Sequence, residues 1–449
     1  MGKYSLKHSY IIVLCKISTF IIDKPLKFEH NHSDMDFRND LELLAPAGTL
    51  TNLTTAINAG CDAVYFGVDG FNMRQNNSAK FTLDDLSEIA TTCHAKNVKC
   101  YLALNTLVYD QNIDAMKKAI DAVKASGVDA IITFDMSALV YAKEVGVEVH
   151  ISTQHSISNI EAVKFFANWA DRVVLARELS LEDVKYIVDE IKNQDVRGPK
   201  GELVEVEIFV HGAMCVSVSG RCGMSLYMNK TSANCGQCTQ PCRRPYEIKD
   251  KFTGKSLVVD NEYVMSPEDL CTIGMLDEII ATGVVSLKVE GRSRSAEYVD
   301  VVIRTYREAI TAIKNDTYTK EKVEQWNKDL GTVFNRGKSE GFYRGLPWGA
   351  WSKGSDSQAT QKKVLVGTIK HYYANIGVAE VDIHASDLKE GDEIVINGNT
   401  TGVLRMKAKG MILNETSVDY VKQGDLVTFV VPEKVRSSDK LYKLVDVKG

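Results

Sequence analysis

The 449-residue sequence lacks the features that mark several protein classes. No apolar run reaches the roughly 20 residues that a membrane-spanning helix needs, and the nearest one, residues 10–22, is interrupted by Lys16. The H-E-x-x-H motif of zinc peptidases is absent. A net charge of −5 argues against a surface that binds polyanions everywhere, although a local basic stripe can still bind RNA. We therefore expect a globular protein that does not associate with membranes.

The first 40 residues differ in character from the rest of the chain. Lys3 and Lys7 precede the apolar stretch, as in targeting signals, but no small-residue cleavage site follows it. Met35 offers an alternative start. We predict that residues 1–40 are a disordered or targeting extension, with any organelle signal in residues 1–34, and that the protein is otherwise cytoplasmic.

From residue 41 onward, short apolar runs alternate with amphipathic helical stretches, which is typical of βαβ units around a parallel sheet. The predicted strands are residues 41–44, 63–66, 99–104, 130–133, 147–151, 172–175, 204–210 and 284–289. The predicted helices include residues 83–95, 113–126, 160–169, 181–191 and 296–314, with Asn159 and Ser180 as N-caps and Gly127 as a C-terminal stop. The sequence predicts an α/β fold with a TIM-like (β/α)8 barrel over residues 41–350. A doubly wound open sheet is the alternative.

The seventh round contains an insertion. Its strand ends near His211, but the next helix signature, a serine followed by a proline, comes only at Ser266. Residues 211–265 are far more than the usual βα loop of about 2–6 residues. In a barrel this insertion lies at the C-terminal ends of the strands, where TIM-barrel active sites are found. We therefore expect it to carry function.

The C-terminal part follows a different pattern. Residues 351–362 are polar and predict a linker, and short strands are predicted after it at residues 364–369, 376–381, 392–396, 402–406 and 426–431. Two similar turn segments, Leu388-Lys-Glu-Gly-Asp392 and Val421-Lys-Gln-Gly-Asp425, precede strands. Residues 363–449 are therefore predicted to form a small β-barrel domain.

Six of the ten cysteines lie between Cys215 and Cys271. Such clustering indicates metal ligation or redox chemistry more than a disulfide framework. A [4Fe–4S] cluster takes four thiolates, whereas a four-cysteine zinc site usually has two short C-x2-4-C pairs. Only residues 235–242 resemble such a pair, so the spacing favours iron–sulfur over zinc. The cysteines predicted to be ordinary core residues are Cys61, Cys93 and Cys100.

The insertion resembles a known signature. Glu207-x-Phe209-x-x-Gly212-Ala-Met-Cys215, Gly220-x-Cys222-x-x-Ser225 and Cys238-x-Gln-Pro-Cys242-Arg are similar to the signature of the collagenase-like peptidases of unknown catalytic type. Other segments that resemble this family are Leu43-Leu-Ala-Pro-Ala-Gly48, Ala63-Val-Tyr-Phe-Gly67, Ser152-Thr-Gln154, Leu175-Ala-Arg-Glu178 and Leu287-Lys-Val-Glu-Gly-Arg292. The resemblance extends from about residue 41 to the C-terminus.

The resemblance implies a function that differs from the family's name. Better understood members support hydroxylation of RNA bases or quinone precursors without molecular oxygen, and several carry a [4Fe–4S] cluster. One barrel with one small C-terminal domain is most similar to the members that help form 5-hydroxyuridine at the tRNA wobble position, with prephenate as the oxygen source. The rRNA-hydroxylating relative is longer and ranks second. The implied partners are tRNA, a small organic acid and a homologous subunit.

Five cysteines are candidates for the four cluster ligands. By resemblance, Cys215, Cys222 and Cys238 match ligand positions of the family. The fourth ligand is either Cys242 or Cys271, and the latter is predicted to lie on the helix after the insertion. Cys235 is an additional cysteine where the common pattern has none.

Polar side chains after the predicted strands would line the mouth of the barrel. His211 and Glu290 are candidates for acid–base or substrate-orienting roles. Arg177 and Arg292 are candidates to bind the carboxylates of a prephenate-like acid in bidentate fashion. A structural ion pair of Glu290 with Lys288 or Arg292 is the alternative. The remaining predicted mouth residues are Asn105, Asp135, Gln154 and Glu178.

A basic run next to the cysteines predicts RNA contacts. Arg243, Arg244 and Lys249 would contact phosphates, and Tyr246 would stack on a base. A solvated surface is the alternative. Two other functions remain open: a peptidase with a cysteine nucleophile beside His211, and an RNA-binding scaffold with a structural metal.

Overall fold

The structure is a computed structural model, which describes residues 41–73, 81–247, 249, 251–254, 263, 265–347, 349–354 and 356–447. The predicted extension, residues 1–40, lies outside the described residues. Within the described part of the chain, no helix combines the length and the apolar character that crossing a bilayer requires.

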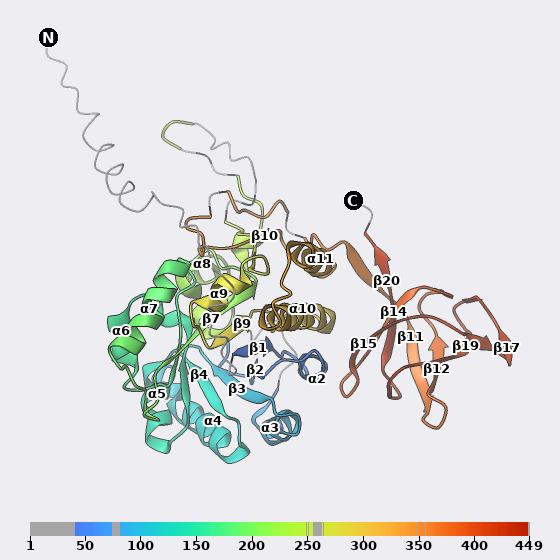
Figure 1. Ribbon diagram of the computed structural model, residues 1–449, viewed down its shortest axis with the longest axis horizontal. Coiled ribbons are helices and arrows are strands. Elements are labelled where there is room, and N and C mark those ends of the chain that lie inside the picture. The colour runs from blue at the N-terminus through green and yellow to red at the C-terminus, as the bar shows by residue number, and fades with distance from the viewer. Residues whose placement is uncertain are drawn as a thin grey trace, which may run out of the picture. The chain divides into compact units, whose positions relative to one another are not determined.

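Eight parallel strands close into a barrel (Figure 1). Each strand pairs with the next, and the last pairs with both the first and the seventh. The strands are β1 (Glu42–Pro46), β2 (Ala63–Phe66), β3 (Lys99–Leu104), β4 (Ala130–Thr133), β5 (Val149–Ile151), β6 (Arg172–Val174), β7 (Glu205–Gly212) and β9 (Ser286–Val289). The predicted TIM-like barrel is confirmed, and the open-sheet alternative is wrong.

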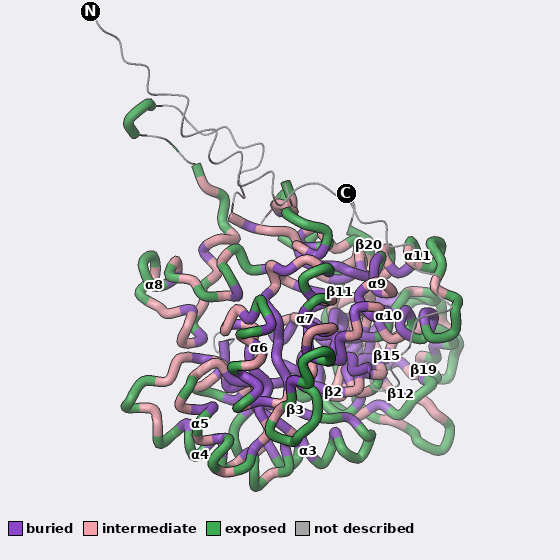
Figure 2. The backbone as a smooth tube through the Cα atoms, turned by 60° about the vertical axis from the view of Figure 1, so that its left-hand side comes forward, coloured by how far each residue is buried: buried purple, intermediate pink, exposed green. Residues whose placement is uncertain are grey.

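Helices surround the barrel and bury one face each, so that buried residues concentrate at its centre and exposed ones on the outer helices (Figure 2). They are α2 (Leu50–Asn58), α3 (Leu86–His94), α4 (Ile113–Ser126), α5 (Met136–Val145), α6 (Ile160–Phe166), α7 (Leu181–Asn193), α9 (Leu276–Ala281), α10 (Ala296–Lys314) and α11 (Lys320–Gly331). The predicted caps are confirmed: Asn159 and Ser180 accept backbone N–H bonds, and Gly127 ends α4 in the left-handed conformation.

The seventh round departs from the prediction at one point. No helix begins at Ser266 within the described residues; Asp269–Cys271 instead forms strand β8, and α9 begins at Leu276. Strand β8 pairs antiparallel with β7 and parallel with β10 (Lys338–Ser339). The predicted helical position of Cys271 is therefore wrong, because pairing on both sides of this segment overrides its local capping signature.

Before β8, the insertion contains only short helical segments. These are η5 (Val218–Gly220), α8 (Met224–Asn229), η6 (Ala233–Cys235) and η7 (Pro241–Arg243). Side chains of the barrel hold it in place: Glu178 accepts a hydrogen bond from the Ser219 backbone at 2.9 Å, and Arg177 donates to the Ala213 carbonyl at 3.0 Å.

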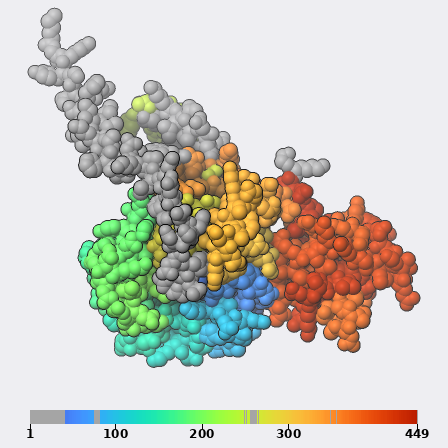
Figure 3. Space-filling model, viewed as in Figure 1, coloured from blue at the N-terminus to red at the C-terminus, as the bar shows by residue number. Residues whose placement is uncertain are grey.

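The C-terminal part is an antiparallel β domain, coloured orange to red in Figure 3. Its strands are β11 (Gln361–Tyr373), β12 (Val378–Ile383), β13 (Leu388–Lys389), β14 (Glu393–Gly398), β15 (Gly402–Lys407), β16 (Ile412–Leu413), β17 (Thr416–Ser417), β18 (Tyr420–Val421), β19 (Leu426–Val430) and β20 (Lys440–Asp446). The two similar turn segments pair with each other as β13 and β18, where Leu388 lies opposite Val421 and both are buried.

Ion pairs fill the barrel interior near the N-terminal ends of the strands. Arg172 contacts Glu42 at 2.5 Å and Glu207 at 3.5 Å, and Lys288 contacts Glu207 at 2.6 Å. Burial alone would raise the pKa of Glu207, but the charges of Lys288 and Arg172 hold it below its usual range. Lys288 is therefore committed to Glu207 in this interior network.

Candidate functional site

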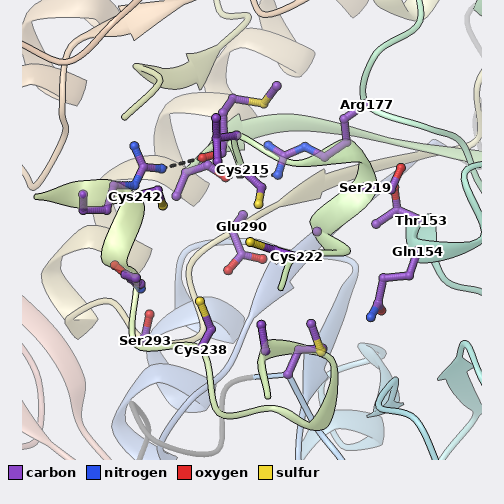
Figure 4. Close-up of a pocket in the computed structure, with 18 of the residues that line it drawn as sticks. Thr153, Gln154, Arg177, Cys215, Ser219, Cys222, Cys238, Cys242, Glu290 and Ser293 are labelled. Atoms are coloured by element: carbon purple, nitrogen blue, oxygen red, sulfur yellow. Dashed lines mark hydrogen bonds between the residues drawn. The ribbon is translucent and has the colours of Figure 1, made fainter. Parts of the chain in front are cut away.

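A pocket opens at the C-terminal mouth of the barrel, beneath the insertion (Figure 4). Four cysteines of the insertion line it, namely Cys215, Cys222, Cys238 and Cys242. Five arginines also line it, namely Arg177, Arg243, Arg292, Arg294 and Arg336. Glu290 is the one acidic residue among its described lining residues. The site thus combines soft metal ligands with a marked excess of positive charge.

Backbone geometry at the end of β7 brings the insertion over the mouth. Gly212 has φ +107°, and a Cβ atom there would collide with the Glu290 carbonyl oxygen. The Glu290 N–H donates to the His211 carbonyl at 2.8 Å. A glycine is therefore required where the chain leaves β7, and this close approach places the cysteines beside Glu290.

The four cysteine side chains surround the Glu290 side chain (Figure 4). Burial raises the pKa of the Cys242 thiol; Arg243 opposes this shift, and the charges of Cys215, Cys238 and Cys222 add to it. The four sulfur atoms thus share one electrostatic environment, in which a bound cation would offset their mutual repulsion as thiolates.

Hydrogen-bond donors also approach the sulfur atoms. The Met224 backbone N–H donates to the Cys222 sulfur at 3.3 Å. The Ser225 hydroxyl lies 3.9 Å from the Cys238 sulfur, and the Ser217 hydroxyl lies 3.2 Å from the Cys215 sulfur. Such donors stabilise thiolates and tune iron–sulfur clusters. The donor set therefore fits a four-thiolate cluster.

Arg177 reaches the pocket with part of its guanidinium unpaired. Its Nη1 donates to the Ala213 carbonyl, and its guanidinium lies 4.5 Å from the centre of the Phe209 ring. Its Nε and Nη2 atoms are buried without a hydrogen-bond partner among the described residues. Buried donors of a charged group are costly to leave unpaired, so these atoms are suited to an anionic ligand.

Glu290 and Arg292 contact side chains of β2 and of the segment that follows it. The Tyr65 hydroxyl donates to the Val289 carbonyl at 2.9 Å and lies 3.3 Å from a Glu290 carboxylate oxygen. Arg292 is buried, and its Nη1 lies 3.4 Å from the Asn72 side-chain oxygen. Both side chains are thus positioned at the pocket by neighbouring strands.

Comparison with known proteins assigns this architecture to a family. The model of peptidase family U32 matches residues 48–352, which include the barrel and the insertion. The chain belongs to peptidase family U32. The family resemblance inferred from the motifs is therefore confirmed.

Members of family U32 with different names are similar to this chain. It is 46% identical over 405 residues to a collagenase of Porphyromonas gingivalis, which covers 90% of this chain and 98% of that protein. It is 37% identical over 414 residues to an uncharacterized protease of Methanocaldococcus jannaschii, with the same coverage of 90% and 98%. It is 31% identical over 364 residues to tRNA hydroxylation protein P1 of Bacillus subtilis, covering 80% and 83%. The collagenase is thus more similar than the tRNA hydroxylation protein, contrary to the similarity expected from domain organisation.

The structure separates the five predicted ligands of this U32 protein. Cys242 lies at the pocket with Cys215, Cys222 and Cys238, whereas Cys271 is buried in β8, with its sulfur 3.9 Å from the Asn327 side-chain oxygen. Among the described cysteines, Cys271 is therefore not part of the mouth group. The additional Cys235 points elsewhere, and its sulfur lies 3.8 Å from the Tyr109 hydroxyl.

His211 does not lie among the described residues that line the pocket. It is buried in β7, with Nδ1 3.3 Å from the Tyr306 hydroxyl. Burial, followed by the charges of Lys338 and Arg294, lowers its pKa to about 3. The prediction that His211 acts in acid–base chemistry at the mouth is wrong, because the side chain packs behind the strand as a neutral imidazole.

Two of the other predicted mouth residues also have structural roles. Asp135 caps α5 through the Ser137 N–H at 2.9 Å, and Glu178 accepts from Ser219. Asn105 and Gln154 do line the pocket.

The predicted RNA-binding run divides into a structural and an exposed part. Arg243 donates to the Ser266 hydroxyl at 2.9 Å, to the Pro267 carbonyl at 2.6 Å and to the Met214 carbonyl. It fastens the insertion and is not available to phosphates, which corrects the prediction. The Tyr246 hydroxyl also makes a contact within the insertion, since it donates to the Pro241 carbonyl at 2.7 Å. Arg244 and Lys249 form the exposed part.

Three residues of the site escaped the sequence interpretation. Arg294 follows Arg292 by two positions, a spacing that could have placed both on one side of the chain. Arg336 comes after α11, and no local pattern connects it to the mouth. Tyr227 on α8 of the insertion was not singled out, and its side chain is 88% exposed.

Proposed function

We propose that this U32 protein supports iron–sulfur-dependent hydroxylation of an RNA base, with a tRNA uridine as substrate and a prephenate-like acid as co-substrate. The observation that carries the proposal is the convergence of Cys215, Cys222, Cys238 and Cys242 on an arginine-lined pocket at the barrel mouth. A hydrolytic site does not require four thiols around one space, whereas a [4Fe–4S] cluster does.

The four mouth cysteines would hold the cluster. Once bound there, it would supply one-electron chemistry beside the pocket. Glu290 lies among the four cysteines (Figure 4), where its carboxylate can accept or return a proton of a bound substrate. Its contact with the Tyr65 hydroxyl fixes the carboxylate in that position.

The arginines of the pocket would bind the organic acid. Arg177 and Arg292 reach the pocket after β6 and β9, the two strands that flank β7, so each can take one carboxylate of a dianion. Guanidinium–carboxylate pairs are often bidentate, and two such pairs would orient the acid within the site. Arg294 and Arg336 share the single carboxylate of Asp269, at 4.0 and 3.7 Å, so the pair keeps a net positive charge that favours an anionic ligand.

The rim of the insertion would bind the RNA. Tyr227 is 88% exposed, and its neighbours Leu226 and Met228 are also exposed. Lys230, Arg244 and Lys249 are exposed cations of the same insertion. Exposed aromatic side chains with nearby cations stack bases and contact phosphates of single-stranded RNA, such as an anticodon loop.

A peptidase is the second candidate, because the relative named collagenase is 46% identical. In that case one mouth cysteine would be the nucleophile, and Glu290 rather than His211 would be the base at hand. The other three thiols would then have no role in the reaction, which is why we rank this function second.

The test is metal analysis followed by an assay of each function. Full-length protein is purified without oxygen, and iron, sulfide and zinc are measured for wild type, Cys222→Ala and the matched control Cys235→Ala. We expect about four irons and four sulfides in wild type and control, and none in Cys222→Ala. In a strain lacking the gene, tRNA 5-hydroxyuridine should return with wild type and Cys235→Ala only. Zinc in place of iron that is lost in Cys222→Ala, or gelatin cleavage with unchanged tRNA nucleosides, would refute the proposal.

A further inference from the structure

A second group of metal-ligating side chains lies at the opposite end of the barrel from the pocket. His94 is the last residue of α3, Cys100 is the second residue of β3, and Asp129 directly precedes β4. These positions belong to the N-terminal ends of the strands, whereas the mouth cysteines lie at the C-terminal ends. The group is therefore separate from the site described above and does not depend on its proposed function.

The ligand atoms of these three residues are already close together. One atom from each, the Cys100 sulfur, a His94 ring nitrogen and an Asp129 carboxylate oxygen, all lie within 4.8 Å of one another. His94 Nε2 lies 3.0 Å from Asp129 Oδ2, and the Cys100 backbone N–H donates to the same oxygen at 2.7 Å. The backbone of β3 thus fixes the carboxylate beside the thiol.

A second thiol borders this group. Cys93 precedes His94 in α3, is fully buried, and is hydrogen-bonded to the Cys100 side chain. Two adjacent thiols, an imidazole and a carboxylate therefore meet where three elements come together. The burial expected for Cys93 and Cys100 is confirmed, but their surroundings are more polar than those of ordinary core cysteines.

We propose that His94, Cys100 and Asp129 bind a zinc ion whose fourth position is open to water, with Cys93 beside the Cys100 ligand. Sulfur and nitrogen ligands select zinc over magnesium or calcium, which prefer oxygen. With bond lengths of about 2.0–2.3 Å, the ligand atoms of a tetrahedral zinc ion lie roughly 3.3–3.8 Å apart. The His94 side chain is 45% exposed, so it can rotate. Its rotation can bring the distances between the ligand atoms into this range and also admit the ion. The ion would tie α3 to β3 and β4.

The alternative is an ion pair without a metal. The contact of His94 with Asp129 is partly exposed, with side-chain exposures of 45% and 31%, and such pairs contribute little to stability. The pair by itself also gives no role to the two thiols. Zinc binding distinguishes the two interpretations directly.

The experiment uses the full-length protein, purified without oxygen and dialysed against limiting Zn²⁺. Zinc per chain is measured for wild type, His94→Gln, Cys100→Ala, Cys222→Ala and the matched control His371→Gln, which alters an exposed histidine of the β domain. We expect one zinc per chain in wild type and control. Zinc affinity should fall at least about tenfold in His94→Gln and Cys100→Ala but not in Cys222→Ala, with an unchanged circular dichroism spectrum reporting an intact fold.

Three results would overturn the zinc site. Wild type that retains no zinc, although its circular dichroism spectrum shows a folded protein, would show that the group is an ion pair. Equal zinc affinity in His94→Gln would place the ion elsewhere. Zinc that disappears from Cys222→Ala but persists in Cys100→Ala would assign it to the mouth cysteines.

Discussion

The two ends of the barrel interior both contain buried arginine, but their charges are balanced in different ways. At the N-terminal end, Arg172 is paired with Glu42 and Glu207, and Lys288 completes the network. At the C-terminal mouth, five arginines line a pocket that has one acidic lining residue among those described, and two of them, Arg294 and Arg336, share buried Asp269 at 4.0 and 3.7 Å. Arg177 Nε and Nη2 and Arg336 Nε there are buried without a hydrogen-bond partner in the described part of the chain.

The comparison distinguishes buried charges that stabilise the fold from buried charges that can bind a ligand. A buried ion network must be internally complete, because each unpaired charge costs several kcal/mol. Unpaired buried donors in a pocket lower the stability of the folded protein. They bind an anion strongly, because the donors were already desolvated when the protein folded. The following predictions, from the largest expected effect to the smallest, would sharpen or break this contrast.

Cys242→Ala should abolish cluster binding at the mouth, whereas Cys271→Ala should not. Cys242 lines the pocket, and Cys271 lies in β8. Iron per chain in protein purified without oxygen should fall from about four to below one in Cys242→Ala only. Loss of iron in Cys271→Ala with full iron in Cys242→Ala would mean that the mouth group has been assigned wrongly.

Arg172→Met should lower the free energy of unfolding by about 3–5 kcal/mol, because Glu42 and Glu207 remain buried without their partner. Urea unfolding measures this. The matched control is Arg197→Met, since Arg197 is 51% exposed and pairs with exposed Asp195. A loss below about 1 kcal/mol for Arg172→Met would show that the interior network is not structural.

Arg177→Lys should weaken binding of prephenate by about 10- to 100-fold while leaving stability nearly unchanged. Lysine keeps the charge but loses the planar fork that binds a carboxylate in bidentate fashion. Calorimetric titration of wild type and variant measures the affinity, with exposed Arg221→Lys as the control. Equal affinities would remove Arg177 from the proposed acid site.

The buried His211 should make the protein less stable in mild acid. Its pKa is lowered to about 3, first by burial and then by Lys338 and Arg294. The unfolded chain therefore binds a proton below its ordinary pKa of about 6.5, whereas the folded protein does not. Stability should fall between pH 7 and pH 5 by about 2 kcal/mol from this residue. Urea unfolding across this range should show a smaller slope for His211→Asn than for wild type and His371→Asn, and equal slopes would contradict the assignment.

Tyr227→Ala should weaken tRNA binding by about 5- to 20-fold without loss of iron, because it removes a stacking surface at the rim. Filter binding at fixed salt concentration measures this. Tyr186→Ala is the matched control, since Tyr186 is 61% exposed but lies on α7. Equal weakening in both variants would indicate non-specific contacts.

The pattern of apolar residues along the sequence was sufficient to predict most of the fold. The runs at residues 63–66, 99–104 and 130–133 became strands with the predicted limits, and the caps of α6 and α7 lie where serine and asparagine indicated. These features are local, since alternation and capping depend on residues only a few positions apart. Strand β8 was missed because its pairing partners, β7 and β10, are distant in sequence.

The site was only partly predictable for the same reason. The motif around Cys215 and Cys222 indicated a thiol cluster, and the ends of β6 and β9 indicated Arg177 and Arg292. The choice of Cys242 over Cys271 depended on which segment paired with β7. The burial of His211 against Tyr306 joins residues 95 positions apart, and no spacing along the chain indicates it.

The sequence by itself determined the eightfold alternation, the family and the cysteine-rich insertion, because each is written in residue types at short spacing. Only the tertiary structure decided which cysteines share a pocket and which arginines are paired. Those properties depend on burial and on contacts between distant segments, which arise only when the barrel closes.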